Sequence, residues 1–141
     1  MRIDYEVIGI PKPQARPKFF RNKAGYVGTY SPKTDWFGLV YMETLKQKNL
    51  LKNRLSGALC VALRFGMPIP KSISKKKRAN LNFVTKKPDV DNLAKAVMDA
   101  MNNTGIWEDD SQVAVLEVSK TYSEEPGCKI IVEELKDGFG E

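Results

Sequence analysis

The sequence predicts an α+β fold, with strands near both ends of the chain and helices between them. Apolar residues alternate with polar or smaller ones in residues 3–9, and two further β-like segments close the chain. A helical apolar stripe begins at residue 90. With 141 residues, 42% of them hydrophobic, the chain is long enough for one core and too short for two comfortable domains. We therefore treat residues 1–141 as a single domain.

The first half of the chain contains two predicted strands, a hairpin and a helix. Residues 3–9 form the first strand, which ends before the prolines of residues 11–34. That proline-rich and basic segment predicts a loop or irregular hairpin with a turn at residues 22–25. Apolar residues on successive helical turns predict a helix from about residue 32 or 34 to residue 53. Residues 58–67 are typical of a buried strand.

The second half is predicted to contain a polar loop, one helix and two strands. Residues 68–87 are rich in lysine and contain two prolines, so we expect a mobile loop or a short irregular excursion. The helix spans roughly residues 89–102. Strands at residues 112–122 and 128–135 follow it, joined by a turn that contains Pro126 and Gly127.

Two observations bear on where the protein works. No segment approaches the roughly 18 to 20 apolar residues of a membrane span, and the first residues lead directly into a strand pattern without a signal-peptide region. Cys60 and Cys128 lack CxxC spacing, and the chain has no histidine that could complete a mixed zinc site. We therefore expect a cytoplasmic protein, without a membrane partner, that contains two buried free thiols.

Charge is divided unevenly along the chain. Residues 1–88 contain 19 Lys/Arg and 4 Asp/Glu, a net charge of +15, whereas residues 89–141 contain 4 and 13, a net charge of −9, which together give the +6 of the whole chain. A polyanion could lie against the first part while a cation is held by the second, which suits phosphodiester chemistry. The alternative is that both halves interleave in space as ordinary charged surface.

The helix predicted from residue 89 carries two different faces. Asp91, Lys95 and Asp99 follow one another at four-residue steps and therefore project together. Beside them runs an apolar stripe that must pack on the sheet. The stripe consists of Val90, Leu93, Ala94, Val97, Met98 and Met101. Chemistry is thus expected at the rim of the contact between helix and sheet.

Carboxylates gather around this helix. Asp89 and Asp91 lie at its start, and Asp109 and Asp110 follow it at the edge of the next strand. Such hard oxygen ligands suit a divalent cation, and the helix dipole favours their ionised form. One aspartate at a helix start is more simply explained as an N-cap. A cap accounts for one residue and leaves the rest of the set unexplained.

Two segments carry a family signature: KPDVDNLAKAVMDAM (residues 87–101) and GIWEDDSQV (residues 105–113). They combine a DxDN element, a lysine four residues after its second aspartate, and a W-x-DD-x-Q-V element at the expected distance. In these features the chain resembles the RusA family of Holliday junction resolvases, found in bacteria and their prophages. Weaker similarity, which covers most of the chain, extends to residues 11–17, 30–33 and 68–72.

The resemblance implies both a fold and a site. It implies a RusA-like α+β fold with a mixed β-sheet and helices packed against it, acting as a homodimer on four-way DNA junctions with Mg²⁺ or Mn²⁺. By the same resemblance, Asp89, Asp91 and Asp110 are the catalytic and metal-binding aspartates, and Lys95 is the catalytic lysine. Asp109 matches a neighbouring acidic position. The basic residues 11–33 resemble those of phage-type members, which implies a bacterial or phage-infected cell.

The expected reaction is metal-assisted hydrolysis of a phosphodiester bond. Lys95 would neutralise charge on the phosphate or orient the nucleophile; the simpler alternative is a helix-surface ion pair with Asp91 or Asp99, worth about 0.3 to 0.5 kcal/mol. Basic residues are expected to bind nucleic-acid phosphates. They are Arg16, Lys71, Lys75, Lys76, Lys77, Arg78, Lys86 and Lys87, with Lys18, Arg21 and Lys23 in the hairpin.

Three alternatives stay open at this point. Phe19, Phe20 or Tyr26 could wedge or stack at the DNA branch, or could equally pack within their own loop. A non-catalytic basic DNA-binding module would explain the basic half and leave the aspartates as caps and solvated residues. A nuclease for flaps, forks or other branched nucleic acid would share the metal site and differ in the surrounding basic surface.

Overall fold

The computed structural model describes residues 1–15, 17–30 and 32–135. Its centre is a four-stranded sheet with the order β1-β6-β4-β5. The strands are β1 (Arg2–Ile8), β4 (Leu59–Pro68), β5 (Val113–Ser123) and β6 (Gly127–Glu134). β6 pairs antiparallel with both β1 and β4, whereas β5 pairs parallel with β4. The sheet is therefore mixed, and the predicted α+β fold is confirmed.

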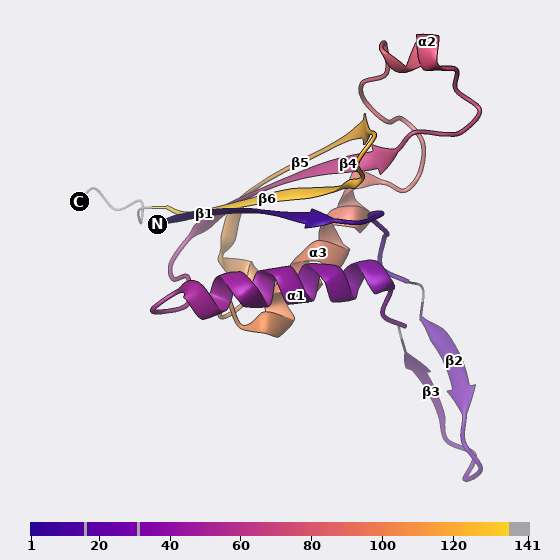
Figure 1. The fold of residues 1–141 in the computed structure, drawn as a ribbon. Coiled ribbons are helices and arrows are strands. Elements are labelled where there is room, and N and C mark those ends of the chain that lie inside the picture. Colours follow the sequence, from indigo (N-terminus) through magenta and orange to yellow (C-terminus); the bar gives the residue numbers. More distant parts are fainter. Residues whose placement is uncertain (16, 31, 136–141) are drawn as a thin grey trace.

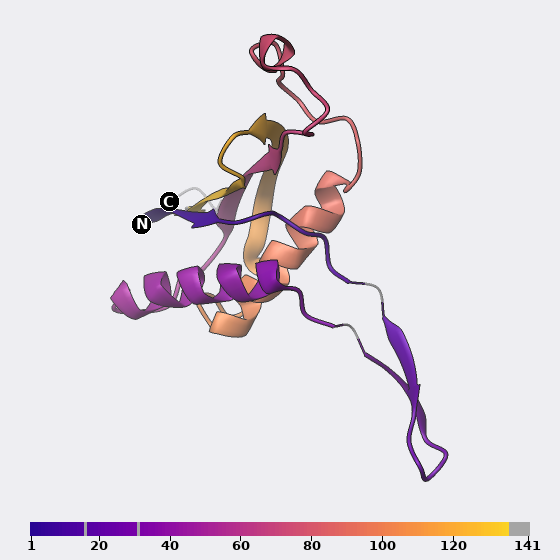
Figure 2. The ribbon, with the colours of Figure 1, turned by 45° about the vertical axis from the view of Figure 1, so that its right-hand side comes forward.

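Helices cover one face of this sheet, and two segments extend away from the body (Figure 1). The covering helices are α1 (Asp35–Leu50) and α3 (Val90–Thr104), which also contact each other. The extending segments are the hairpin of β2 (Lys18–Arg21) and β3 (Val27–Tyr30), and the loop that contains the short helix α2 (Lys75–Arg78). Figure 2 shows the first turn of α3 between these two extensions.

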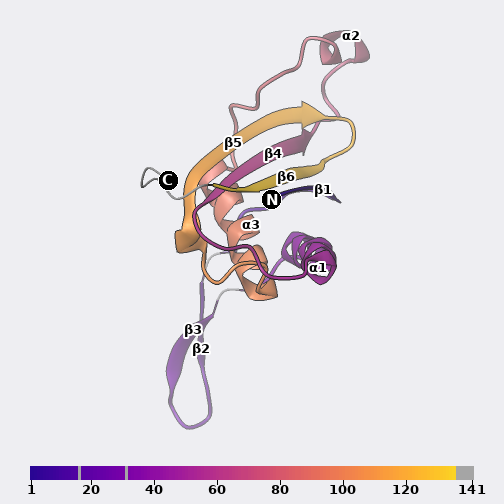
Figure 3. The same ribbon diagram turned by 90° about the vertical axis from the view of Figure 1, so that its left-hand side faces the viewer.

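The core lies between the sheet and its covering helices. Along β4, buried and less buried residues alternate from Leu59 to Met67, so every second side chain enters the core. β1 follows the same pattern and is tied to α1 by a hydrogen bond of 2.7 Å between Tyr5 Oη and Thr44 Oγ1. Seen along the sheet in Figure 3, α1 and α3 lie side by side beneath the strands.

The parallel pairing of β4 and β5 determines where α3 must lie. Two neighbouring parallel strands need a crossover connection, because the chain must return to the end of the sheet where the first strand began before the second strand can start. Here the crossover contains the α2 loop and then α3, which packs its apolar side against the strands. The start of α3 and the start of β5 are thereby positioned by the topology.

Several boundaries differ from the sequence predictions. α1 ends at Leu50 rather than Asn53, and Gln112 belongs to the 3-10 helix η1 (Asp110–Gln112) rather than to the last but one strand. The lysine-rich loop contains one helical turn, α2, that the sequence did not predict. Cys128 is a buried free thiol as expected, but Cys60 is only partly buried because it lies on the uncovered face of β4. Within the described residues, no helix is both long enough and apolar enough to cross a membrane.

Candidate active site around the start of helix α3

α3 begins and ends with ordinary helix signals. Asp89 occupies the N-cap position with an extended backbone, and its carbonyl accepts the hydrogen bond from Leu93 N at 3.1 Å. Its carboxylate makes no capping hydrogen bond. The helix ends at Gly105, whose φ of +74° is a left-handed conformation that favours glycine. Asp89 is thus the N-cap residue through its backbone carbonyl, while its exposed carboxylate makes no capping contact.

The apolar stripe of α3 is confirmed, with one exception. Leu93, Val97 and Met101 are fully buried, and Ala94 and Met98 are nearly so. Val90, the first residue of the helix, is 38% exposed. Beside the stripe, Asp91 and Lys95 are exposed and Asp99 is half-buried. This edge of α3 is the accessible rim that the spacing predicted.

The segment after α3 is anchored by its tryptophan. Trp107 is 1% exposed, and its indole Nε1 donates to Asn102 Oδ1 on the last turn of α3. Leu55 N donates to Ile106 O at 2.8 Å, which ties the segment to the chain before β4. The segment just before Asp109 and Asp110 is therefore held by contacts both with α3 and with the chain before β4.

Gln112 and Asp109 form the turn that follows. Gln112 Oε1 accepts from Glu108 N at 2.8 Å and from Asp109 N at 3.1 Å, while its Nε2 donates to Gly57 O at 3.0 Å. The Asp109 carboxylate accepts from Ser111 N at 3.3 Å, so Asp109 caps η1. Hydrogen bonds from Ser111 hold the pKa of the Asp109 carboxyl below its usual range. These contacts give Asp109 and Gln112 structural roles that the spacing of the motif alone could not show.

Asp110 is the member of the acidic pair that enters the predicted site. It lines one cavity of about 520 Å³ together with Asp91, Lys95 and Asp99. The other lining residues are apolar and come from α3 and β5: Val90, Ala94, Met98, Val113, Leu116 and Val118. Three carboxylates and an ammonium group thus share a cavity whose walls are otherwise hydrophobic.

Asp89 faces a neighbouring space. It lines a separate groove of about 960 Å³ with Lys87, Asn92 and Lys95 on one wall and residues 11–15 on the other. The sequence grouped Asp89 with Asp91 because they are two residues apart. Asp89, however, is the N-cap with an extended backbone, whereas Asp91 belongs to the first helical turn, and the two line different spaces.

Lys95 connects the two spaces, since it lines both the cavity of Asp110 and the groove of Asp89. It takes part in none of the ion pairs within 4.0 Å that join described residues. The helix-surface ion pair with Asp91 or Asp99, considered from the sequence, is therefore not formed. The ammonium group remains available to a ligand on either side.

The donor groups of the cavity suit a divalent cation in type, although they are not gathered into a cage. Carboxylate oxygens are the preferred ligands of Mg²⁺. Within the described part of the chain, no three acidic or cysteine side chains lie close enough together to hold a metal ion. Mg²⁺ is commonly bound by one or two carboxylates, with water and substrate phosphate oxygens completing its shell. Asp91 and Asp110 fit that kind of site.

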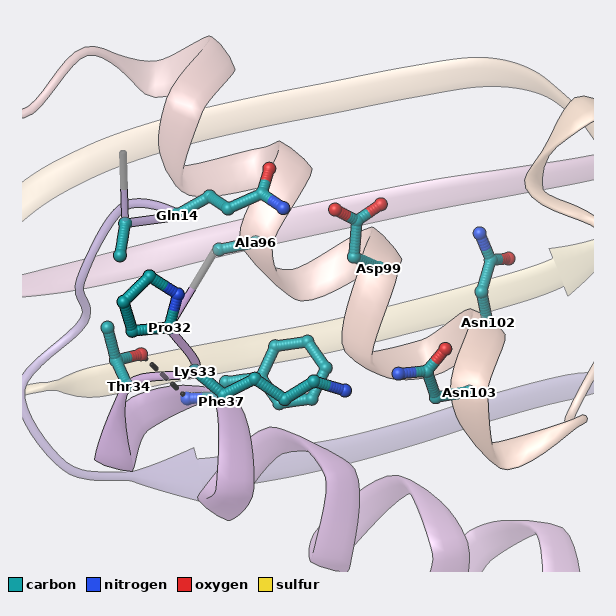
Figure 4. A pocket seen from close by; sticks show the side chains of 10 residues that line it. Gln14, Pro32, Lys33, Thr34, Phe37, Ala96, Asp99, Asn102 and Asn103 are labelled. Carbon is teal, nitrogen blue, oxygen red and sulfur yellow. Dashed lines mark hydrogen bonds between the residues drawn. The ribbon is translucent and has the colours of Figure 1, made fainter. Parts of the chain in front are cut away.

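A further cavity, of about 290 Å³, lies between α1, α3 and the segments that lead into and out of the hairpin (Figure 4). Asp99, Asn102 and Asn103 line it from α3. On the opposite side, Thr34 Oγ1 accepts a hydrogen bond from Phe37 N at 3.2 Å and thereby caps α1. Asp99 therefore borders two cavities, and it is half-buried whereas Asp91 is exposed.

Lys120 is a residue of this region that sequence reasoning missed. Its Nζ donates to Lys86 O and, at 2.8 Å, to Pro88 O, immediately before Asp89. The same segment is tied to β5 by backbone hydrogen bonds, from Val84 N to Lys120 O at 3.1 Å and from Tyr122 N to Asn82 O at 2.9 Å. The lysine thus holds the strand end and the helix start together. The spacing of 32 residues between Lys120 and Pro88 gave no signal for this contact.

The predicted nucleic-acid contacts fall into two groups. Lys71, Lys75, Lys76 and Lys77 are exposed on the α2 loop, and Lys86 and Lys87 are exposed just before α3. Arg78 is half-buried, and its Nε donates to Ile73 O at 3.3 Å, so it also stabilises the loop. Arg16 lies outside the described residues.

Comparison with known proteins gives this site its context. The family described as "Endodeoxyribonuclease RusA" matches residues 9–133, nearly the whole chain. A Bacillus subtilis (strain 168) protein, described as "Uncharacterized protein YqaN", is 36% identical over 140 residues, which cover 94% of this chain and 96% of that relative. Both motifs that line the cavity and groove lie within the matched residues. The chain therefore belongs to the RusA family of endodeoxyribonucleases.

Proposed function

We propose that this protein is a Mg²⁺-dependent, structure-specific endonuclease that resolves four-way DNA junctions. The observation that carries the proposal is the cavity in which Asp91, Asp110 and Lys95 meet, in a chain of an endodeoxyribonuclease family. Exposed lysines on the α2 loop and before α3 supply a surface for the phosphates of DNA. A bacterial or phage-infected cytoplasm would be its place of action.

Asp91 and Asp110 would hold the cation, with Asp99 at the edge of the same cavity. When bound, Mg²⁺ or Mn²⁺ would stabilise charge on the scissile phosphate and favour ionisation of the attacking water. Asp89 would act from the neighbouring groove, where it faces incoming DNA beside Lys87 and Lys95. The apolar walls of the cavity would exclude bulk water and strengthen electrostatic contacts inside it.

Lys95 would bind the phosphate at the boundary between the two spaces. Its ammonium group is exposed and not engaged in an ion pair, and it borders both Asp89 and Asp110. A cation placed there stabilises the negative charge that develops on the phosphate oxygens as the bond breaks. The carboxylates and the lysine would then act on the same phosphate from two sides.

The direct test is cleavage of a four-way junction beside linear duplex, a Y-fork and a flap of matched sequence. We expect paired cuts in the junction with Mg²⁺ or Mn²⁺, no cuts with EDTA, and little cutting of the duplex. Faster cutting of flaps or forks would assign a different branched substrate to the same site. Binding without cutting under any of these metal conditions would identify a non-catalytic DNA-binding module.

The α2 loop is proposed as a phosphate clamp. Replacing Lys75, Lys76 and Lys77 by Gln is expected to lower the slope of log Kd against log salt concentration by about 2.7, since each phosphate contact contributes about 0.9. The control is the same replacement of three exposed cations in the last turns of α1 and the segment just after it; the end of α1 lies away from α2 in Figure 1. These are Lys46, Lys52 and Arg54. An unchanged slope in the loop variant would place the loop away from DNA.

Lys120 is proposed to position the start of α3. Replacing it by Met keeps the length of the side chain and removes the donor to Lys86 O and Pro88 O. We expect kcat to fall about tenfold or more with little change in KM, because a displacement of about 1 Å at a reacting group can cost about 100-fold. Lys120→Arg, which keeps the charge and the donors, should restore much of kcat. Equal losses in both variants, or a loss explained by unfolding in a thermal scan, would contradict the positioning role.

We also propose that the protein acts as a homodimer. A four-way junction is cut at two symmetry-related phosphates, which two identical sites related by a two-fold axis can reach together. Mixing wild-type and Asp91→Asn subunits should therefore convert a supercoiled cruciform plasmid to nicked circles. Wild-type dimers should give the linear product. A wild-type protein that sediments as a monomer and still linearises the plasmid in one encounter would contradict paired sites.

A further inference from the structure

The β2–β3 hairpin is an arm that extends from the body of the protein (Figures 1 and 2). Its strands pair with each other, Phe19 opposite Thr29 and Phe20 opposite Gly28, and not with the four-stranded sheet. A two-stranded hairpin standing alone is only marginally stable. Such an element is therefore expected to bind something outside its own fold.

The two faces of the arm differ. On one face the rings of Phe20 and Tyr26 contact each other, with centroids 5.9 Å apart and planes tilted by 51°. The Phe20 ring also covers Gly28, where a Cβ would lie 2.7 Å from it. Because neighbouring residues of a strand point to opposite faces, Phe19 and Arg21 lie on the other face. The arm is thus stabilised from one side, and Phe19 is left on the other.

Phe19 is not packed within its own loop. Phe19 is 82% exposed, and Val27, on the strand opposite, is 52% exposed. Residues 10–34 contain six Lys/Arg and no Asp/Glu. An exposed aromatic ring beside a cation on a wholly basic segment matches the chemistry of nucleotide binding, in which bases stack on rings and phosphates pair with cations. The packing alternative considered from the sequence does not hold for this ring.

The base of the arm is fixed beside the candidate active site. Lys12 Nζ pairs with Asp35 Oδ1 at 2.7 Å, and Lys33 Nζ lies 4.5 Å from the centroid of the Phe37 ring. The same base forms one wall of the groove whose other wall carries Asp89 and Lys95. DNA that lies in this groove would pass directly onto the arm.

We propose that the arm enters the branch point of the DNA and stacks Phe19 on a base exposed there, with Arg21 on an adjacent phosphate. This inference rests on the proposed action on branched DNA. Bases at a branch are more easily unstacked than those of a continuous duplex, so a single ring can distinguish the two. Phe19 would then determine preference for the junction, while the carboxylates and Lys95 perform the cleavage.

A second copy of this chain is the competing occupant of the arm. DNA supplies a phosphate beside every base, so a single ligand would match both the exposed ring and the six cations of residues 10–34. The two occupants also require different properties of residue 19. Protein packing needs only an apolar side chain, whereas base stacking needs a ring.

The experiment compares Phe19→Leu with Phe19→Tyr in the full-length protein. Dissociation constants for a four-way junction and for a duplex of the same sequence are measured in EDTA, so that cleavage does not interfere. The control is Phe83→Leu, which removes an aromatic ring at a residue that is 66% exposed and lies outside the arm. Sedimentation of each variant gives the oligomeric state.

We expect Phe19→Leu to weaken junction binding about fivefold or more with duplex binding unchanged, and Phe19→Tyr and Phe83→Leu to stay near wild type. If the wild type prefers the junction and Phe19→Leu keeps that preference, the proposed role of the arm is wrong, while the proposed function stands. An altered oligomeric state in Phe19→Leu would assign the arm to a second copy and also overturn it. A wild-type protein without junction preference would instead contradict the proposed function, and the arm's role with it.

Discussion

Replacement of Asp110 by Asn is expected to lower the rate of junction cleavage by about two to three orders of magnitude, the loss typical of removing one strong electrostatic contact to a transition state. Asn keeps the size of the side chain and removes the charge that the cavity shared with Asp91 and Lys95 can offer to a cation. Junction binding in EDTA should survive, because the exposed lysines that contact phosphates are unchanged. Single-turnover cleavage with Mg²⁺ measures the effect.

The matched control is the neighbouring residue. Asp109→Asn removes the same charge one position away, but Asp109 caps η1, and Asn is as good a capping residue as Asp. We therefore expect near-normal cleavage and near-normal thermal stability from this variant. If Asp109→Asn were the inactive protein and Asp110→Asn the active one, the assignment of the acidic pair would be reversed.

Local sequence patterns were enough to predict most of the elements. The alternation in β1 and the stripe of α3 are direct consequences of which side chains a strand or a helix can bury on one side. The hairpin followed from its turn residues, which favour tight reversal wherever they occur. Such signals involve neighbours in sequence, and for that reason they could be read without knowing the fold.

The site was predictable only in part, because its geometry depends on contacts between distant segments. Lys120 reaches the start of α3 from a strand that follows it by some thirty residues, and Gln112 reaches back to Gly57. Lys120 did not stand out from its surroundings in the sequence, and the motif that contains Gln112 did not show that its side chain bonds to Gly57. The sequence also did not show that Asp89 lines the groove and Asp91 the cavity, because this depends on which segments lie opposite each residue.

Lys95→Gln is expected to have the second large effect, a fall in kcat of about two orders of magnitude with folding unchanged. No ion pair within 4.0 Å among the described residues involves Lys95, so its removal should not shift the midpoint of thermal unfolding. Its position between the groove of Asp89 and the cavity of Asp110 is where a phosphate could contact both. The loss should therefore appear in the chemical step, measured with saturating enzyme in a single turnover.

Lys87→Gln provides the contrast, because Lys87 is an exposed lysine of the same groove that does not border the cavity of Asp110. It should weaken junction binding and reduce the salt dependence of binding by about 0.9, while the single-turnover rate at saturation stays near that of the wild type. If Lys95 served only to attract DNA, Lys95→Gln would behave like Lys87→Gln, with weaker junction binding and an unchanged single-turnover rate. A rate loss confined to Lys95→Gln would place its ammonium group at the phosphate that is cut.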